Sequence, residues 1–591
     1  MNHAIQDRLS SLRQAMSAAG IAATIIPQTD SHQSEYIADF WQVRRFLSGF
    51  TGSAGTLVVT ADKALLWTDS RYFLQAAQQL EGTSVILMKE GIPGVPTIAD
   101  WLANELPAGS SVGIDMMVYS YSERQSLCQR LGRRGISVVD FDPASVWSDR
   151  PALPPSKIFI HDIKYAGKSA KDKISTILQN GAEVDADSVF ISALDEIAWT
   201  LNIRSSDVQY NPVATAFLYL SANGSTLFTD PSKLTDEVVD YLKNEGVVVR
   251  GYTDVLDFLA SLPADSRVHV EPGRNASKIF DTLGNRAVKG DSPVALPKAC
   301  KNDTQLAGVR AAMERDGVAL VKAFMEIERR LSVGERLTEM DIAEILRTMR
   351  SAQPLFFDES FGTIAGYGPH GAIVHYEADE TSNSVIETGN LLLIDSGAQY
   401  LDGTTDITRT ISIGQPTDLQ RHDFTLVMKG HIALARQIFP EGTRGAQLDA
   451  LARQFLWNEG LSYLHGTGHG VGHFLNVHEG PQSIRLNNVP ATLHPGMITS
   501  NEPGLYRENI HGIRCENLVL TIPAMETEFG KFYRFETLTL FPFDLSLFDK
   551  SIMTDDEIEW INSYHTTVRA RLSPLLNSAE RTWLELKTRT L

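Results

Sequence analysis

Cysteine is scarce in this sequence, which has only three in 591 residues: Cys128, Cys300 and Cys515. They are odd in number and far apart, whereas a disulfide framework uses an even number of cysteines at short, regular spacings. The sequence therefore argues against structural disulfides, and a reducing, cytoplasmic setting is expected.

Long apolar runs and dense basic runs are missing as well. No stretch approaches the twenty apolar residues that cross a bilayer, so no membrane partner is expected. Residues 1–19 have the pattern of an amphipathic helix, with Asp7 and Arg8 inside it, rather than that of a signal peptide. Acidic residues outnumber basic ones by 72 to 53, giving a net charge of -19, and no Lys/Arg-rich segment could follow a phosphate backbone. Nucleic acid is therefore not an expected partner.

The chain is long enough for roughly three or four domains with ample cores. Strand and helix patterns alternate between about residues 20 and 150, and a similar order recurs between about 157 and 298, which predicts a degenerate structural repeat. A proline-rich segment around residues 142–155 is the predicted linker between the two copies. The predicted domain boundaries are 1–155, 156–301, 302–540 and 541–591.

The second half of the chain has a different pattern. A long amphipathic helix is predicted over residues 303–331, and a capping box begins another helix over about 417–439. Residues 391–394 form a continuous apolar run, which is typical of a buried strand, and Asp395 follows at its end. Helices alternate with long antiparallel strands, so the predicted class of this part is α+β.

Chemistry-bearing residues concentrate in this half, where ten of the 15 histidines lie between His370 and His511. Five side chains there suit metal ions, and each lies in a segment rich in Gly, Thr or Arg: Asp395, Asp406, His469, Glu502 and Glu516. Four carboxylates neutralise two dications, and ligation dominated by oxygen favours manganese or a similar ion. Two neighbouring ions can share and ionise one water beside a polarised carbonyl, which predicts a hydrolase.

The spacing of Asp395 and Asp406 constrains the strand pairing between them. An ideal two-residue turn at Asp402-Gly403 would place Asp406 opposite Gln399, about 13 Å along the strand from Asp395 at 3.3 Å per residue. That distance is too long for a shared metal cluster. If both are ligands, the loop must be irregular or bulged, whereas the alternative makes Asp402 a turn residue and Asp406 a solvated strand end.

His469 lies in a segment, residues 465–473, with glycine at every second position. Such spacing disfavours a helix and lets backbone approach closely. The segment lacks the Lys-Ser/Thr of a phosphate-binding loop and does not fit the dinucleotide fingerprint, so nucleotide binding is disfavoured. We predict His469 as the ligand and His473 as a core or supporting residue.

Glu502 and Glu516 each lie beside residues that could orient them. Pro503 ends a strand and leaves Glu502 at a turn. In an extended strand Arg514 and Glu516 share one face and Cys515 points to the other, so Arg514 can orient the carboxylate or the substrate. Cys515 is not expected to act as a nucleophile.

Two further histidines, His375 and His478, could transfer protons or stabilise an oxyanion. Each taken alone is better explained by a structural histidine with satisfied hydrogen bonds.

Six strings of this half together resemble the pita-bread metallopeptidases, and within them the aminopeptidase P family in its three-domain cytosolic form. They cover residues 395–398, 402–410, 465–472, 477–481, 501–504 and 512–517. Residues 41–60 and 195–212 resemble that family's first two domains, so the resemblance covers nearly the whole chain. It implies a C-terminal pita-bread catalytic domain preceded by two related α/β domains of the creatinase N-terminal type.

The resemblance also implies residue roles. The five metal-binding candidates match the family's ligands to two divalent ions, with Asp406 and Glu516 bridging; manganese is expected, with zinc or cobalt as alternatives. Glu502, His375 and His478 are implied catalytic residues. His375, His465, His478 and Arg514 are implied to line the substrate site.

The implied reaction releases the N-terminal residue from peptides with proline at the second position, by attack of a metal-bridging hydroxide. The Xaa-Pro bond is a tertiary amide without an N–H, so it needs a dedicated pocket. The alternatives are a prolidase restricted to Xaa-Pro dipeptides, a methionine aminopeptidase, which the chain length disfavours, and a catalytically silent pita-bread binding module. Residues 541–591 have a helical pattern that fits either a homodimer contact or core packing, and a homodimer is the expectation from the resemblance.

Overall fold

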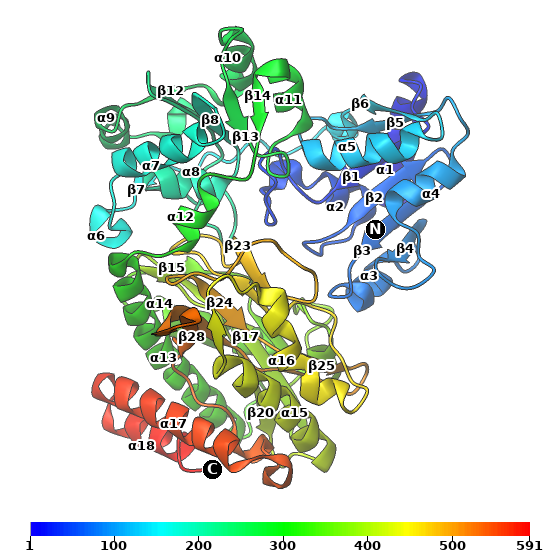
Figure 1. Ribbon diagram of the computed structural model, residues 1–591. Coiled ribbons are helices and arrows are strands. Elements are labelled where there is room, and N and C mark those ends of the chain that lie inside the picture. Colours follow the sequence, from blue (N-terminus) through cyan, green and yellow to red (C-terminus); the bar gives the residue numbers. More distant parts are fainter. Residues whose placement is uncertain (1) are drawn as a thin grey trace. The chain divides into compact units, whose positions relative to one another are not determined.

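The computed structural model describes residues 2–591, and the chain divides into two compact units. The first comprises Met1–Ile163 with Lys168–Val294, and the second comprises Lys164–Gly167 with Ala295–Leu591. Figure 1 shows the elements of both units, coloured along the sequence.

The first unit contains two six-stranded sheets of the same topology. In spatial order the strands of the first sheet are β4 (Val85–Lys89), β3 (Ala64–Thr68), β2 (Thr56–Thr60), β1 (Ala23–Pro27), β5 (Ser111–Ile114) and β6 (Ser137–Asp140). Those of the second are β12 (Val247–Arg250), β11 (Ser225–Phe228), β10 (Phe217–Ser221), β8 (Ser188–Ile191), β13 (Val268–Val270) and β14 (Ala287–Lys289).

The two sheets also agree strand by strand in direction. In each sheet, the first three strands along the chain pair antiparallel. The fourth strand then pairs parallel at one edge, and the fifth and sixth strands pair parallel at the other edge. The predicted repeat is therefore confirmed. Its main helices are α1 (Asn2–Ala18), α3 (Phe73–Leu80), α4 (Ile98–Glu105) and α5 (Tyr121–Gly132) in the first copy, and α7 (Ala170–Ala182), α8 (Leu194–Leu201), α9 (Asp236–Asn244), α10 (Val255–Ser261) and α11 (Ser277–Leu283) in the second.

The strands of the second unit form four small sheets, three of which matter for the site. The largest has the order β21 (Ile438–Pro440), β28 (Gly530–Thr537), β27 (Asn517–Thr527), β24 (Ile498–Asn501), β22 (Gly468–Gly470) and β23 (Glu479–Ile484). A three-stranded sheet contains β16 (Ile364–Tyr367), β17 (Asn390–Ser396) and β20 (Ile407–Ile413). A hairpin is formed by β25 (Gly504–Arg507) and β26 (His511–Arg514), and the fourth sheet by β15 (Phe356–Glu359), β18 (Ala398–Tyr400) and β19 (Gly403–Thr404).

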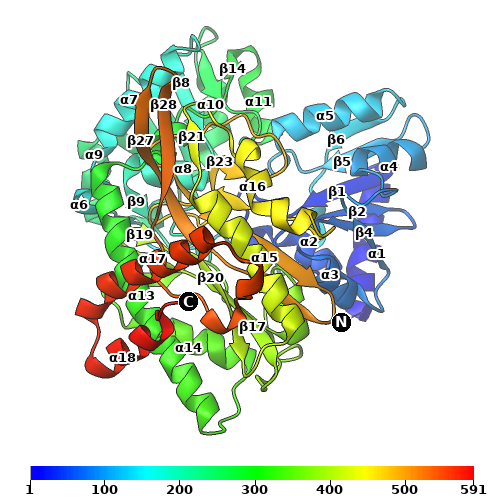
Figure 2. The same cartoon turned by 60° about the horizontal axis from the view of Figure 1, so that its bottom comes forward.

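Helices pack around these strands. They are α12 (Ala295–Ala299), α13 (Asp303–Ser332), α14 (Glu339–Ser351), α15 (Asp418–Ala435), α16 (Gly445–Trp457), α17 (Asp555–Leu572) and α18 (Ser578–Lys587). Reciprocal capping boxes begin α13 at Asn302, α14 at Thr338 and α15 at Thr417. Figure 2 shows α15 beside α16, and α13 beside both C-terminal helices.

Most predicted elements of this unit are confirmed, with one difference in length. The predicted helix over 417–439 ends at Ala435, because Phe439 belongs to β21 and pairs with Tyr533 of β28. Pairing with a neighbouring strand thus overrides the apolar periodicity at the end of the helix. Among the helices of residues 2–591, none has the length and apolar character of a membrane span.

The C-terminal helices belong to the core of the second unit. Ile561, Val568 and Leu572 of α17 and Leu584 of α18 are each 0% exposed. They join one large apolar cluster with α13, α14, α15 and strands β17, β24 and β27. Core packing within the subunit is therefore confirmed for the apolar side chains of residues 541–591.

Candidate metal centre

The hairpin between Asp395 and Asp406 turns one residue earlier than predicted. Gln399 pairs with Thr404 and Tyr400 with Gly403, so the two turn residues are Leu401 and Asp402 rather than Asp402 and Gly403. Gly403 is needed for packing: a Cβ there would lie 3.1 Å from the Ala312 Cβ and 3.2 Å from the Val309 Cα of α13. The prediction of the turn at Asp402-Gly403 was therefore wrong.

The observed register brings the two aspartates close together. Asp395 of β17 pairs with Thr408 of β20. Continuing the same register places Asp406 opposite Gly397, two positions before Thr408, so Asp395 and Asp406 are diagonal neighbours. The ladder is interrupted at Gly397, where an added Cβ would overlap the Thr405 carbonyl and the Ser360 hydroxyl. The register is the same on both sides of this gap, so it does not slip as expected; the earlier turn is what brings the two aspartates together.

His469 lies on β22, whose glycines allow the adjacent strands to approach. A Cβ at Gly468 would overlap the carbonyl oxygen of Ser500 on β24, and one at Gly470 would overlap that of Glu479 on β23. The His469 N–H donates to the Ser500 hydroxyl at 2.9 Å. These contacts fix the histidine between two strands.

The ring of His469 is oriented for binding through Nε2. Its Nδ1 lies 3.0 Å from the Gly470 carbonyl, to which it donates. Its Nε2 lies 3.5 Å from Asp406 Oδ2 and 3.4 Å from Glu502 Oε1. Burial lowers the pKa of His469, but the Asp406 and Glu502 carboxylates outweigh it and raise that pKa to about 9.

Glu502 follows β24 directly and is held at both its backbone and its side chain. Its N–H donates to the Thr467 carbonyl at 2.8 Å, and the Ser500 hydroxyl donates to Oε1 at 3.1 Å. Burial and the neighbouring Asp406 and Asp395 carboxylates raise the pKa of Glu502 to about 7.

Glu516 lies in the two-residue break between β26 and β27. Its N–H donates to the Thr408 carbonyl at 3.0 Å, and the Thr408 hydroxyl donates to Oε2 at 2.8 Å. The other oxygen, Oε1, is buried without a hydrogen-bond partner, as is Asp395 Oδ1. Burial and the surrounding carboxylates raise the pKa of Glu516 well above its ordinary value.

The donor set fits divalent metal ions. Ligand atoms of Asp406, His469 and Glu516 all lie within 4.8 Å of one another. Buried carboxylate oxygens without hydrogen-bond donors are costly unless a cation compensates them. The two unpartnered oxygens of Asp395 and Glu516 are therefore the feature of the site that a cation would explain.

Arg514 is oriented toward the same site and connects two further residues to it. It donates to Asp395 Oδ2 from Nη2 at 2.6 Å and to the Tyr506 hydroxyl from Nη1 at 2.9 Å. Tyr506 in turn lies 2.8 Å from His465 Nε2, while His465 Nδ1 lies 2.7 Å from the Gly466 carbonyl. A neutral His465 therefore carries its proton on Nδ1 and accepts the Tyr506 proton at Nε2.

Sequence reasoning missed Tyr506 and Thr408. Thr408 accepts from Arg514 Nε at 3.2 Å and donates to Glu516, so Arg514 and Glu516 share one side, as predicted. The signal that could have identified Tyr506 is its spacing along the strand. Tyr506 lies two residues after Gly504, so both are on one face of the strand, and Gly504 pairs with Arg514.

The structure places His478 at the site and His375 in a nearby segment of chain. The rings of His478 and His469 are 4.3 Å apart between centroids, nearly perpendicular. His375 is half-buried in the turn after the 3-10 helix η6 (Gly368–Ala372). That helix contacts β26 so closely that a Cβ at Gly512 would overlap the Gly371 carbonyl.

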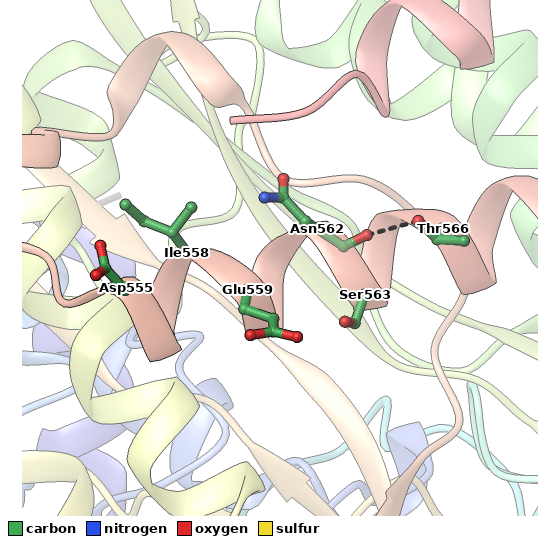
Figure 3. A pocket seen from close by; sticks show the side chains of 6 residues that line it. All are labelled: Asp555, Ile558, Glu559, Asn562, Ser563 and Thr566. Atoms are coloured by element: carbon green, nitrogen blue, oxygen red, sulfur yellow. Dashed lines mark hydrogen bonds between the residues drawn. The ribbon is translucent and has the colours of Figure 1, made fainter.

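Three other features do not contribute donors to this cluster. His473 is 2% exposed and part of the interior, as predicted. Burial raises the pKa of the Cys515 thiol to about 12, which is unsuited to a nucleophile. The hollow drawn in Figure 3 lies on the exposed face of α17, and its lining contains none of the predicted site residues: it consists of Asp555, Ile558, Glu559, Asn562, Ser563 and Thr566.

Comparisons with known proteins agree with this architecture. Residues 307–522 match the model of metallopeptidase family M24 and residues 531–591 match the C-terminal region of peptidase M24. Residues 8–148 and 149–305 each match a creatinase/prolidase N-terminal domain.

Relatives match over almost the whole chain. Aminopeptidase P2 of Arabidopsis thaliana is 42% identical, covering 99% of this chain and 89% of its own. A probable Xaa-Pro aminopeptidase P of Aspergillus flavus is 41% identical over 99% of this chain and 92% of its own. The crystal structure of an X-prolyl aminopeptidase from Caenorhabditis elegans, described as a cytosolic enzyme with a di-nuclear active site, superposes with a TM-score of 0.96 at 35% identity, covering 99% and 100% of the two chains. The chain therefore belongs to metallopeptidase family M24, among the aminopeptidase P proteins with two creatinase-type N-terminal domains.

Proposed function

We propose that this protein is an aminopeptidase that releases the N-terminal residue from peptides with proline at the second position. The observation that carries the proposal is the convergence of Asp406, His469 and Glu516 within 4.8 Å beside unpartnered carboxylate oxygens. The names of the relatives and the di-nuclear site of the nematode enzyme support it.

The proposed ligands of two divalent ions are the five residues predicted from the sequence, with manganese as the expected metal: Asp395, Asp406, His469, Glu502 and Glu516. When bound, such a pair of ions acidifies a shared water and polarises the scissile carbonyl. Burial and mutual repulsion raise the pKa values of the Asp395, Glu502 and Glu516 carboxyl groups, and bound cations would oppose both effects.

The protein's own groups have separate tasks in this proposal. Glu502, whose Oε1 lies 3.4 Å from His469 Nε2, would take the proton of the attacking water. His478, beside His469, and His375 stabilise the tetrahedral intermediate and the departing proline nitrogen. Arg514 keeps Asp395 in place through its bond of 2.6 Å, and His465 lines the substrate site.

A peptide panel tests the specificity. We expect rapid cleavage of the first bond of Xaa-Pro-Pro tripeptides and of longer Xaa-Pro peptides, and little cleavage when alanine replaces the proline at the second position. Activity confined to Xaa-Pro dipeptides would instead establish a prolidase.

Metal analysis of the same preparation tests the site. We expect about two equivalents of metal per chain in the native protein and a loss of both metal and activity in Asp406→Ala. A fully active Asp406→Ala protein would refute the ligand assignment, and a metal-free, inactive native protein would favour a binding module.

We further propose the domain boundaries 1–155, 156–301, 302–540 and 541–591, a cytoplasmic location and a homodimer. The two sheets of the first unit support the first boundary, and the cytosolic description of the nematode enzyme supports the location. Sedimentation velocity over a range of concentrations tests the dimer; a single species of 65.2 kDa would exclude it.

A further inference from the structure

A buried arginine, Arg409 on β20, has no carboxylate among its hydrogen-bond acceptors. The residue is 2% exposed, and burial lowers the pKa of its guanidinium. Its six acceptors are all uncharged: the carbonyls of Thr408, Glu516, Phe541 and Pro542, the Asn517 side-chain oxygen and the Tyr564 hydroxyl. Burying a cation is costly unless its donors are well satisfied, so a specific task is expected for it.

One part of this network contacts the candidate metal centre. Thr408 and Arg409 are consecutive on a strand, so their side chains point to opposite faces. Thr408 donates to the Glu516 carboxylate at 2.8 Å, and Arg409 donates from Nη1 to the carbonyl of the same Glu516. Arg409 Nη2 also reaches the next residue, Asn517, at 2.8 Å. Glu516 is therefore held at its side chain and at its backbone by two neighbours on one strand.

The other part of the network lies in the C-terminal segment. Arg409 donates to the Phe541 carbonyl at 2.7 Å, the Pro542 carbonyl at 3.1 Å and the Tyr564 hydroxyl at 3.0 Å. Its guanidinium carbon lies 4.0 Å from the centre of the Phe543 ring. Since Tyr564 belongs to α17, the C-terminal helix determines where this guanidinium can lie.

The residues on either side of Glu516 have a second support on α15. His431 Nδ1 lies 3.2 Å from the Cys515 carbonyl, and the Asn517 amide nitrogen lies 3.3 Å from His431 Nε2. Burial lowers the pKa of His431 to about 3, so this ring is neutral and accepts the amide at Nε2. The break that carries Glu516 is thus fixed from two directions. Arg409 connects it to the C-terminal segment, and Tyr564 also donates directly to the Asn517 side-chain oxygen at 3.3 Å.

We propose that Arg409 is a positioning residue for Glu516, and that residues 541–543 with Tyr564 form the second half of its binding site. The C-terminal helical segment then contributes to metal binding from within the same subunit. This inference rests on the proposed function, in which Glu516 is one of the metal ligands.

Two substitutions test it, each compared with a matched control. Arg409→Lys keeps the charge and loses the planar fork, and Tyr564→Phe keeps the ring and removes only the hydroxyl. Arg571→Lys is the control, because Arg571 lies on the same helix with an exposed pair to Glu314. Binding of Mn²⁺ to each metal-free protein is measured by calorimetry, and thermal unfolding of the metal-free proteins is measured in EDTA.

We expect Mn²⁺ affinity about 10–100-fold weaker in Arg409→Lys, as for residues that orient metal ligands, and a loss of about three- to tenfold in Tyr564→Phe. Excess Mn²⁺ should restore activity toward an Xaa-Pro peptide in both. Arg571→Lys should bind Mn²⁺ like the native protein. A purely structural role would lower the unfolding temperature and leave the Mn²⁺ affinity per folded chain unchanged, which would overturn the inference.

The two proposals fail in different ways. Native protein that binds two Mn²⁺ and cleaves Xaa-Pro peptides, together with unchanged affinity in both variants, would overturn the role of Arg409 alone. If Arg409→Lys does not fold, Tyr564→Phe decides the question. A native chain that binds no Mn²⁺ would overturn the proposed function and this inference with it.

Discussion

Arg514 donates from Nη2 to Asp395 Oδ2 at 2.6 Å, and the two side chains are only 2% and 11% exposed. Only Oδ2 of Asp395 is used in this bond, whereas Oδ1 is buried without a partner. The arginine therefore orients the aspartate so that one oxygen remains available to a cation. The same guanidinium reaches Tyr506, which links the aspartate to His465 at the other side of the site.

Replacing Arg514 with lysine should therefore reduce activity more than stability. A lysine keeps the charge but cannot donate to Asp395 and Tyr506 at once in a planar arrangement. We expect kcat/KM for an Xaa-Pro peptide to fall about 10–100-fold, with weaker metal retention during dialysis.

The control for this prediction lies on the paired strand. Arg507 of β25 makes a bidentate bond to Asp423, at 2.6 and 2.8 Å, away from the acidic cluster. Arg507→Lys should change kcat/KM by less than about threefold. Equal losses in the two variants would show that the hairpin, rather than the contact with Asp395, limits activity.

Glycines of the His469 segment should differ sharply in their tolerance of alanine. A methyl group at Gly468 would overlap the Ser500 carbonyl, which is backbone and cannot rotate away, so β22 would have to move from β24. At Gly466 the nearest atoms would be 3.5 Å away, an ordinary contact. We expect Gly468→Ala to lose about 2–4 kcal/mol of unfolding free energy and most of its metal, and Gly466→Ala to change stability by less than about 1 kcal/mol. Urea unfolding and metal analysis of both proteins measure this, and similar values for the two would contradict the geometry.

Local sequence signals determined much of this fold correctly. The capping box at Thr417 marked the start of α15, because a cap depends on residues only three positions apart. The repeat in the first unit was also visible, since each copy needs the same order of strands and helices.

Features that depend on distant parts of the chain were not predictable in the same way. Asp402-Gly403 has the composition of a hairpin turn, yet Gly403 is a glycine because α13 lies against it. Tyr506 was missed because its approach to Arg514 depends on the β25–β26 register, which sequence alone does not fix. Likewise, nothing local to Arg409 indicates that five of its six acceptors lie more than 100 residues away.

Two buried histidines should make stability depend on pH. Burial lowers the pKa of His431 and of His565 to about 3. Between about pH 6.5, the value in the unfolded chain, and about pH 3, the unfolded state binds a proton at each site and the native state does not. Stability is therefore lost as the pH falls through this window, by about 1.4 kcal/mol per pH unit for each histidine.

Substitution of one of these histidines isolates its share of the pH effect. The Nε2 of His565 accepts the Phe543 N–H at 3.0 Å, a bond that a glutamine oxygen could replace. In His565→Gln the slope of unfolding free energy against pH between 6.5 and 5 should be about 1.4 kcal/mol per unit smaller than in the native protein. Urea titrations in EDTA at several pH values give both slopes, and packing losses cancel because they do not vary with pH. Identical slopes would show that His565 is protonated in the native state.

A buried carboxylate with two lysines should be among the most sensitive positions of the second unit. Glu479 accepts from Lys298 at 2.6 Å and Lys301 at 2.5 Å, and all three side chains are at most 3% exposed. Glu479→Gln would leave two buried ammonium groups without their anion, which should cost about 3–5 kcal/mol of unfolding free energy.

A partly exposed carboxylate that also pairs with two basic residues provides the comparison. Glu326 on α13 also binds two cations, Arg329 and Arg330, but the arginines are 55% and 36% exposed. Glu326→Gln should therefore cost less than about 1 kcal/mol, because water replaces the lost anion. Glu479 follows His478 directly, and on β23 it pairs with Gly470 of β22. Its substitution should therefore also lower kcat at saturating peptide, whereas Glu326→Gln should not. Urea unfolding and initial rates of the two variants give both comparisons; a Glu479→Gln protein as stable as Glu326→Gln would mean that one of the two lysines is neutral in the native protein.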